Sequence, residues 1–295
     1  MRVALAEFFL TENYTFVFII DPQNPGTADG PTSIRAGVTL EEIRSIRPFI
    51  WGFGKNRRIV QRNETCFHEI AAKLLQPVLE CVGQCDILYI VPHKELHYLP
   101  LHAVEINGKS ICERFAVSYL PSASMIQTCQ ENNVRRGNED FRYSRIFAAG
   151  TGAKEDLLET RKKYIEEVET VVDYFEESTS TVLRGAKATR SAFMDKSPDC
   201  DLVHIAAHGY FNAEEPLESG LFLAARNKLP SLFDKRRFHN HVLSVSDLSR
   251  VDLHANLVVL NGCFTGMSEV RSGDELLGLA RGLFIAGVPS MMLSL

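Results

Sequence analysis

The sequence predicts an α/β fold in which helices flank a mostly parallel β-sheet. Short apolar runs alternate with longer segments whose apolar residues recur at helical spacing, and the distances between the runs suit right-handed crossovers between parallel strands. Two of the runs, at 203–207 and 257–260, each lead to a polar residue flanked by glycine. Ligands bind at the carboxyl ends of strands in an open α/β sheet, so these strand ends are the candidate functional crevice.

Composition and charge limit the class of protein. The chain has 295 residues, of which 45% are hydrophobic and 23% charged, as in a globular protein with a sizeable core. The net charge of −5, without a basic stripe, disfavours direct nucleic-acid binding. No apolar run approaches the roughly 20 residues that span a bilayer, and residues 1–7 lack a signal-peptide pattern. Seven cysteines at irregular spacing then predict free thiols, a cytoplasmic location and no membrane association.

The first half contains three expected strands, each followed by proline or turn residues, and two expected helices. The strands cover 14–20, 86–92 and 115–120, and the helices cover 40–51 and 66–81. The polar stretch 130–143 has no apolar period and is the predicted linker. We therefore divide the chain into an N-terminal domain of residues 1–140 and a C-terminal domain of residues 141–295.

The second half restarts the alternation of strands and helices. Its expected strands cover 145–150, 181–183, 203–207, 221–224, 257–260 and 290–295, and its expected helices cover 162–175, 189–195, 244–248 and 274–286. Thr189 is the expected N-cap of its helix. The helix over 274–286 carries acids in its expected first turn and is followed by Gly287, as helix dipoles and C-caps favour.

The two glycine-flanked strand ends carry a histidine and a cysteine. Neighbouring parallel strands would bring His208 and Cys263 to the same edge, and a thiolate with a histidine base is the minimum for covalent acyl transfer. The backbone N–H groups of Gly209 and Cys263 are the candidate oxyanion-hole donors. We expect His204 to face the opposite side and to hydrogen-bond internally. The other cysteines are expected in the core: Cys66, Cys81, Cys85, Cys112, Cys129 and Cys200.

Three weaker patterns have ordinary explanations. His93, His97 and His102 lack the spacing of a helical zinc site, so we predict no metal and no cofactor. The segment 150–154 lacks the GxxxxGK[ST] spacing of a phosphate loop and is expected to be a strand-end turn. The basic segment 227–241 is either a solvated loop, which we slightly favour, or a loop that the protein itself cleaves.

His208 precedes Cys263 by 55 residues, which is close to the ~50 between the histidine and the cysteine of caspases, where the histidine also comes first. Further motifs accompany this pair. They are LYIVP at 88–92, LHYLPL at 96–101, SYLPSAS at 118–124, HIAAHG at 204–209, SGLFLA at 219–224, VVLNGCFTG at 258–266 and GDELLGLAR at 273–281. Together they resemble the CHAT family of caspase-like cysteine peptidases, in the clan of caspases and separases. The resemblance spans most of residues 80–295, and residues 1–80 fit the more variable beginning of that family.

The resemblance implies a fold, an activity and roles for residues. The fold would be caspase-like, with a non-catalytic lobe at 1–140 and a catalytic lobe at 141–295. The activity would be that of an endopeptidase kept as a zymogen, with His208 as the base, Cys263 as the nucleophile and Gly209 and Cys263 forming the oxyanion hole. Its partners would be a protein substrate and a regulatory protein or activating complex.

Two departures from the family pattern matter. Many relatives carry an acidic residue where this chain has Phe264, which implies a more apolar rim. Relatives also continue past the strand expected at 290–295 with residues that help to build the specificity pocket. We therefore expect the catalytic lobe to be truncated at its C-terminus.

Two other classes of function remain open on the sequence. One is a non-catalytic interaction module, against which the presence of both His208 and Cys263 argues. The other is a Cys-His hydrolase of small acyl or amide substrates, which would more often show a nucleophile elbow such as GxSxG.

Overall fold

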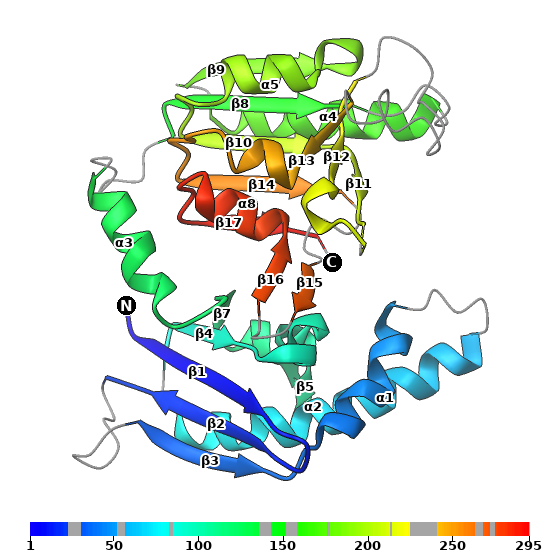
Figure 1. Ribbon diagram of the computed structural model, residues 1–295, viewed down its shortest axis with the longest axis vertical. Helices are drawn as coiled ribbons and strands as arrows, with labels where there is room; N and C mark the ends of the chain where they lie inside the picture. The colour runs from blue at the N-terminus through cyan, green and yellow to red at the C-terminus, as the bar shows by residue number, and fades with distance from the viewer. Residues whose placement is uncertain are drawn as a thin grey trace. The chain divides into compact units, whose positions relative to one another are not determined.

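The computed structural model of the chain describes residues 1–22, 31–51, 57–82, 85–135, 143–151, 158–175, 178–212, 214–224, 241–262, 268–271 and 275–294 (Figure 1). The chain divides into two compact units, Met1–Ile126 and Gln127–Leu295. The domain boundary predicted between residues 140 and 141 lies outside the described residues and stays a prediction.

The first unit is built on a mixed five-stranded sheet with the order β3-β2-β1-β4-β7 (Figure 1). β1, β4 and β7 are parallel, whereas β2 and β3 extend the sheet in antiparallel fashion from β1. The strands are β1 (Val3–Leu10), β2 (Thr15–Ile20), β3 (Thr32–Ala36), β4 (Ile87–Val91) and β7 (Ala116–Tyr119). The helices are α1 (Leu40–Trp51) and α2 (Arg57–Cys81), with 3-10 turns η1 (Lys94–Tyr98), η2 (Leu101–Ala103) and η3 (Ile111–Glu113) around the small hairpin β5 (Glu105–Ile106) and β6 (Lys109–Ser110).

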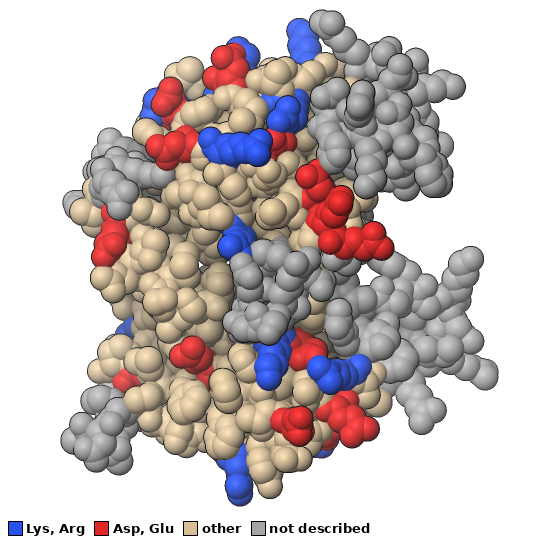
Figure 2. Space-filling model, viewed as in Figure 1, with Lys and Arg blue, Asp and Glu red and all other residues tan. Residues whose placement is uncertain are grey.

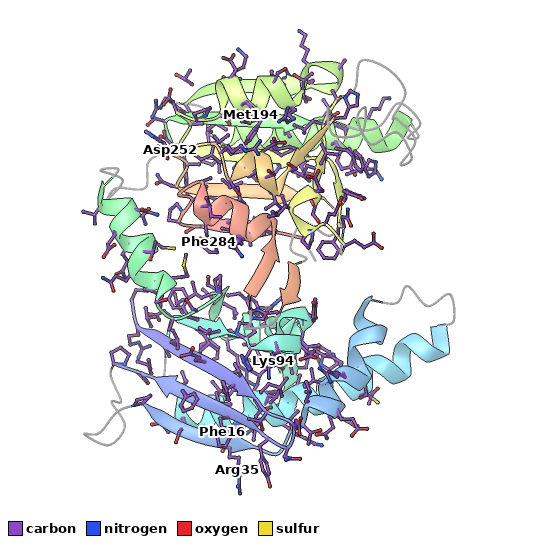
Figure 3. All side chains as sticks on the ribbon, in the orientation of Figure 1. Phe16, Arg35, Lys94, Met194, Asp252 and Phe284 are labelled. Carbon is purple, nitrogen blue, oxygen red and sulfur yellow. The ribbon has the colours of Figure 1, made fainter. Side chains whose placement is uncertain are left out.

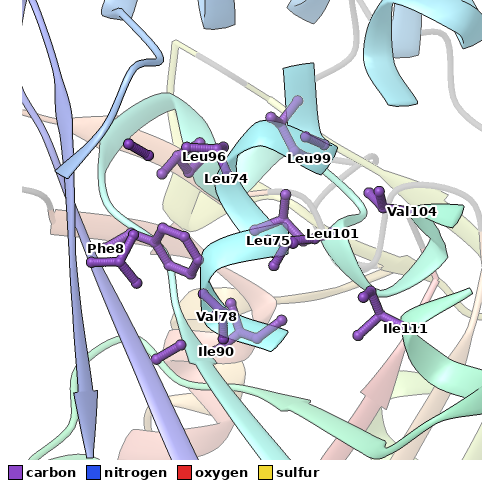
Figure 4. Close-up of a cluster of buried hydrophobic side chains, with 14 of the residues drawn as sticks. Phe8, Leu74, Leu75, Val78, Ile90, Leu96, Leu99, Leu101, Val104 and Ile111 are labelled. Carbon is purple, nitrogen blue, oxygen red and sulfur yellow. The ribbon is translucent and has the colours of Figure 1, made fainter. Parts of the chain in front are cut away.

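The core of this unit forms between the sheet and α2. Leu74, Leu75 and Val78 recur at helical spacing, so they lie on one face of α2, where they join Phe8 of β1 and Ile90 of β4 (Figure 4). All five side chains are buried. Burial of apolar area at about 25 cal/mol per Å² is the main stabilising contribution to such a unit.

The second unit has a five-stranded sheet with the order β17-β14-β10-β8-β9, and all of its pairings are parallel. The strands are β8 (Arg145–Gly150), β9 (Thr179–Arg184), β10 (Leu202–Ala206), β14 (Leu257–Asn261) and β17 (Met291–Leu293). The helices are α4 (Leu158–Asp173), α5 (Arg190–Lys196), α7 (Val245–Leu248) and α8 (Leu279–Ile285). Smaller elements are η4 (Gly185–Lys187), η5 (Pro216–Glu218), the three-stranded sheet of β11 (His208–Tyr210), β12 (Gly220–Phe222) and β13 (Val242–Ser244), and the hairpin β15 (Ser268–Arg271) and β16 (Glu275–Gly278).

Helices cover both faces of the second sheet, as a parallel sheet requires. Val168 of α4 packs against Ala148 and Ala206 on one face. The alternate residues of the same strands face the other side, where they meet residues of α5, α7 and α8, including the partly buried Met194 (Figure 3). The predicted α/β class with a mostly parallel sheet flanked by helices is therefore confirmed.

The structure corrects the sequence expectations in several places, among them β3, which was assigned to no strand, and α2, which begins at Arg57 rather than at residue 66. Residues 3–10, to which no strand was assigned, form β1 in the middle of the first sheet. The predicted linker begins too early, because the helix α3 (Met125–Arg135) continues through its first six residues, where Gln127 hydrogen-bonds Glu131 one turn later at 2.8 Å. The helix expected over 274–286 begins only at Leu279, because Glu275–Gly278 pairs with β15 instead.

Other local predictions are confirmed. Thr189 caps α5 by accepting a hydrogen bond from the Ala192 N–H, and Gly287 ends α8 with a φ of 89°. No helix within the described ranges is both long and apolar enough to cross a membrane.

Candidate active site

The histidine strand and the cysteine strand are direct neighbours in the second sheet. β10 and β14 run parallel, with Leu202 opposite Leu257 and Ala206 opposite Asn261. One residue further on, the Ala207 N–H donates to the Asn261 carbonyl oxygen at 3.1 Å. The chain therefore leaves both strands at the same edge of the sheet, as the sequence predicted for the segments that lead to His208 and Cys263.

Gly262 brings the backbone that follows β14 directly against the backbone that follows β10. A Cβ atom on Gly262 would overlap the carbonyl oxygen of Ala207 and would lie 3.2 Å from the Gly209 nitrogen. Only glycine fits this close approach without a shift of main-chain atoms. Cys263 itself lies outside the described residues, so its juxtaposition with His208 stays a prediction.

His208 begins β11, the strand that pairs with β12 in the small sheet, and it is half-buried. Its ring meets the ring of Tyr164 edge to face, with centroids 5.4 Å apart and planes at 86°. The Tyr164 hydroxyl oxygen lies 3.4 Å from His208 Nδ1. A phenol at that nitrogen limits rotation of the imidazole, and its hydroxyl can either donate to Nδ1 or accept from an Nδ1–H.

Tyr164 comes close to His208 because α4 packs tightly on the end of β8. A Cβ atom on Gly150, the last residue of β8, would overlap the carbonyl oxygen of Tyr164 and lie 3.0 Å from Val168 Cγ2. Sequence reasoning did not select Tyr164. The signal was present, because Tyr164 precedes the inward-facing Val168 and Val172 by one and two turns of helix.

His204 lies on β10 and is buried with 5% of its surface exposed. Its Nε2 is 2.8 Å from Glu167 Oε1 on α4. The predicted internal hydrogen bond of His204 is therefore confirmed. Glu167 is a second residue that the sequence does not reveal, because it is one of several glutamates on a helix that is rich in charged residues.

The chain was compared with protein-family models and with curated proteins. The family model described as the CHAT domain matches residues 64–295, which is well over half of the chain. The chain belongs to the CHAT family. No curated protein matches it. The parallel sheet with helices on both faces agrees with the caspase-like fold implied for a CHAT protein.

Three glutamates lie near Tyr210, two residues after His208. Burial raises the pKa of the Tyr210 phenol, and the nearby carboxylates of Glu215, Glu218 and Glu214 raise it further. These glutamates lie in and beside η5, between β11 and β12. Among the described residues on the face drawn in Figure 2, Lys and Arg side chains are scattered among Asp and Glu side chains and form no continuous basic stripe.

An ion pair supports the sheet face opposite α4. Arg190 of α5 binds Asp247 of α7 with both ends of its guanidinium, through Nε at 2.7 Å and through Nη2. Asp247 also closes a capping box with Ser244. Burial acts to raise the pKa of Asp247, but the hydrogen bonds from Arg190 and Ser244 outweigh it, so that the pKa is lowered. The hydrogen bond to Asp247 raises the pKa of Arg190.

The remaining cysteines differ in exposure more than the sequence predicted. Only Cys200 among the six is buried; Cys66, Cys81, Cys85 and Cys129 are intermediate and Cys112 is exposed. The expectation that all lie in the core is wrong for Cys112, because η3 turns its sulfur outward beside Ser110 Oγ at 3.3 Å. Burial raises the pKa of Cys85, Cys129 and Cys200, which lowers their thiolate fraction.

The histidines of the first unit have structural surroundings. His93 Nδ1 accepts a hydrogen bond of 2.9 Å from the Leu10 N–H, and its ring stacks on Phe9. His102 Nδ1 lies 3.0 Å from the Tyr119 hydroxyl. Within the described parts of the chain, no three His, Cys, Asp or Glu side chains gather as a metal site would require.

Besides the domain boundary and Cys263, three sequence predictions fall on residues outside the described ranges. They concern Phe264, the part of the glycine-rich turn after Thr151, and all of the segment 227–241 except His241.

Proposed function

We propose that this CHAT protein is a cysteine endopeptidase in which Cys263 is the nucleophile and His208 the general base. The observation that carries the proposal is the parallel register of β10 and β14, with Gly262 seated against Ala207 and Gly209. The segments that precede Cys263 and His208 are thereby side by side. A base within reach of a thiol activates it as a nucleophile.

The reaction has two acyl-transfer steps. His208 takes the proton of the Cys263 thiol, and the thiolate sulfur attacks the carbonyl carbon of a peptide bond. The tetrahedral intermediate collapses as His208 returns the proton to the amine nitrogen, the C–N bond breaks and a thioester remains. Water then attacks the thioester with His208 again as base, which releases the carboxylate product and regenerates the thiol.

Tyr164 fits this mechanism as an orienting partner of His208. An Nδ1–H that donates to the Tyr164 hydroxyl oxygen leaves the lone pair of the ring on Nε2. Nε2 is then the atom that exchanges the proton with Cys263 and with the leaving amine. The contact of 3.4 Å is long for a hydrogen bond, and catalytic hydrogen bonds commonly tighten when substrate binds.

The oxyanion of each tetrahedral intermediate needs donors that are already in position. The N–H groups of Gly209 and Cys263 are the donors we assign to it, since Gly209 nitrogen lies beside Gly262 at the start of the segment that carries Cys263. Removing one such donor in other acyl-transfer enzymes costs about 10²–10³ in kcat.

The substrate we propose is a peptide segment of another protein, and the enzyme is a zymogen that acts when a regulatory protein or activating complex binds. It works in the cytoplasm, because the thiol of Cys263 must stay reduced. Neither direct nucleic-acid binding nor membrane association forms part of the proposal, since the net charge is −5.

Labelling with an electrophilic peptidyl ketone tests the proposal. The probe is incubated with the wild type, Cys263→Ala and His208→Ala, and the modified residue is located by mass spectrometry. We expect labelling at Cys263 that is lost in both variants. Exposed Cys112 is an internal reference thiol for the labelling rate.

The alternatives give different results in the same assay. If Cys263 reacts no faster than Cys112 and His208→Ala changes nothing, the chain is a zymogen that awaits its partner, an incomplete catalytic lobe or a non-catalytic interaction module. The same assay on a chain extended past Leu295 separates the incomplete lobe from the other two. If Cys263 is labelled in a His208-dependent manner but only small acyl or amide compounds are hydrolysed, the chain is a small-molecule Cys-His hydrolase.

A further inference from the structure

One carboxylate on α4 joins the two strands that end at the candidate active site. Glu167 Oε1 lies 2.8 Å from His204 Nε2, and Glu167 Oε2 accepts a hydrogen bond of 2.8 Å from Asn261 Nδ2. His204 belongs to β10, and Asn261 is the last residue of β14. A single side chain therefore bridges the histidine strand and the cysteine strand from the sheet face that α4 covers.

The bridge fixes Asn261 in one orientation. While Nδ2 donates to Glu167, Oδ1 accepts a hydrogen bond of 3.3 Å from Ser294 Oγ, just after β17. The backbone oxygen of Asn261 accepts from the Ala207 N–H at 3.1 Å. Rotation of the amide by 180° would turn Oδ1 toward the Glu167 carboxylate and lose that bond, although the Ser294 hydroxyl could then accept from Nδ2. Asn261 is thus held at three points immediately before Gly262.

Attachment of α4 to the sheet does not require this bridge. Val168, the next residue, is fully buried against Ala148 and Ala206. Glu169 binds Arg184 on β9 at 2.6 Å, at the other edge of the sheet. Burying the polar ring of His204 is costly compared with an apolar residue of similar volume. The bridge therefore has a consequence other than holding the helix.

We infer that Glu167 is a positioning residue for the nucleophile. Through Asn261 it holds the end of β14 in register with β10, and with it the turn that leads into Cys263. The nucleophile part of this inference rests on the proposed function, whereas the effect on β14 does not. Glu167 makes no contact with substrate in this role and acts only through its two partners.

The test compares two glutamates on the same helix. Glu167→Ala removes the bridge, Glu167→Gln keeps one amide oxygen that can accept from Asn261, and Glu169→Ala is the matched control that removes an ion pair at the far edge. Hydrogen–deuterium exchange of 257–262 reports on β14. The rate at which iodoacetamide modifies Cys263, followed by mass spectrometry across pH 6 to 9, reports on the nucleophile.

Glu167→Ala is expected to speed exchange at 257–262 and to lower the Cys263 rate about tenfold, the size of one lost charge-assisted hydrogen bond. Glu167→Gln should recover part of the rate, and Glu169→Ala should speed exchange only at β9 and change the rate less than twofold. Equal effects of Glu167→Ala and Glu169→Ala, or unchanged exchange at 257–262, would overturn the inference. If wild-type Cys263 reacts no faster than in His208→Ala, the proposed dyad is not assembled in the isolated chain, and the exchange comparison still decides whether Glu167 holds β14.

Discussion

Each of the two units has a histidine just after a central parallel strand, and the two histidines have different bonding partners. Each has a sheet with adjacent parallel strands at its centre, β1 with β4 in the first unit and β10 with β14 in the second. In each, a histidine follows the end of one of these strands: His93 after β4 and His208 after β10. In the first unit the neighbouring strand binds that histidine, because His93 Nδ1 accepts the Leu10 N–H at the end of β1.

In the second unit the main chain takes over the bonding that His93 performs in the first. The Ala207 N–H donates to the Asn261 carbonyl oxygen, and Gly262 packs on Ala207 and Gly209. The strand ends are thus tied together by backbone, and the His208 ring faces a tyrosine from the covering helix. The sheet edge supplies the location of the histidine in both units, whereas the partners of the two rings differ: a backbone N–H for His93 and a tyrosine for His208.

The largest expected effect is the difference between replacing His208 and replacing His93. His208→Ala should lower the rate at which the peptidyl ketone modifies Cys263 by about 10²–10⁴, the usual contribution of a general base. His93→Ala should leave that rate unchanged and lower the free energy of unfolding by about 1 kcal/mol through the lost hydrogen bond to the Leu10 N–H. Labelling kinetics and urea unfolding measure the two effects. A rate loss in His93→Ala comparable to that in His208→Ala would refute the division of roles.

The next effect concerns the backbone contact at Gly262, which has no counterpart among the described glycines of the first unit. Gly262→Ala introduces a Cβ atom into the Ala207 carbonyl, which should cost about 1–3 kcal/mol and lower Cys263 labelling more than tenfold. Gly37→Ala in the first unit is the matched control, because a Cβ atom there meets nothing within 4 Å. Thermal unfolding and the labelling rate check both variants. Full labelling in a folded Gly262→Ala protein would contradict the predicted close approach of the two strand ends.

A smaller effect distinguishes two capping boxes by pH. Ser244 with Asp247 caps α7, and Ser110 with Glu113 caps η3. The pKa of Asp247 is lowered on folding, so its stabilisation is present above the unfolded pKa of about 3.9 and is lost as the pH falls through the lower folded value. Asp247→Asn should lower Tm at pH 7, and its Tm should fall less than that of the wild type between pH 5 and pH 2.

Glu113→Gln is the comparison for that pH effect. Backbone and side-chain hydrogen bonds from Ser110 lower the pKa of Glu113, but this carboxylate is in contact with water, which screens its charge. Its replacement should therefore change Tm less than Asp247→Asn at pH 7. Circular dichroism melting curves at pH 7, 5, 3 and 2 measure the difference, and the reverse order would show that burial of the Arg190–Asp247 pair contributes nothing.

The smallest expected effect is the change in Cys263 labelling when one of two tyrosines that contact a histidine is replaced by phenylalanine. Tyr164 with His208 and Tyr119 with His102 both meet edge to face, at centroid distances of 5.4 and 5.7 Å. Tyr164→Phe should lower Cys263 labelling by about 2–10-fold and shift its pH profile, as expected for one neutral hydrogen bond. Tyr119→Phe removes the acceptor of the His102 N–H and should affect only stability. A labelling rate unaffected by Tyr164→Phe would remove Tyr164 from the mechanism.

Much of the fold was predictable because its strands are buried on both faces and appear as continuous apolar runs. The strands 145–150 and 86–92 and the helix 40–51 were predicted within one residue of their observed ends. β16 was missed because Leu276 and Leu277 suit helix and strand alike, and only the hairpin pairing with β15 decides between them. The α3 helix was missed because a polar surface helix carries little periodic signal.

For the candidate site, the sequence located the two strand ends but not their supports. His208 and Gly209 were found because glycine-flanked polar residues follow apolar strands, and the register of β10 and β14 agrees with that prediction. Tyr164 and Glu167 lie about 40 residues earlier on a helix, and no local pattern links them to His208, His204 or Asn261. Their roles follow from the crossover that lays α4 over β10, which is a property of the tertiary structure.

The contacts at Gly150 and Gly262 also determine how such a site can diverge. At both positions a main-chain carbonyl occupies the space that any other residue's Cβ would take. Every single substitution there moves the backbone of α4 or of the histidine strand, so neutral drift is blocked at both. A saturation mutagenesis library of this domain should therefore keep both glycines invariant among all clones whose Cys263 reacts with the peptidyl ketone, and variation should be confined to side chains on that fixed backbone.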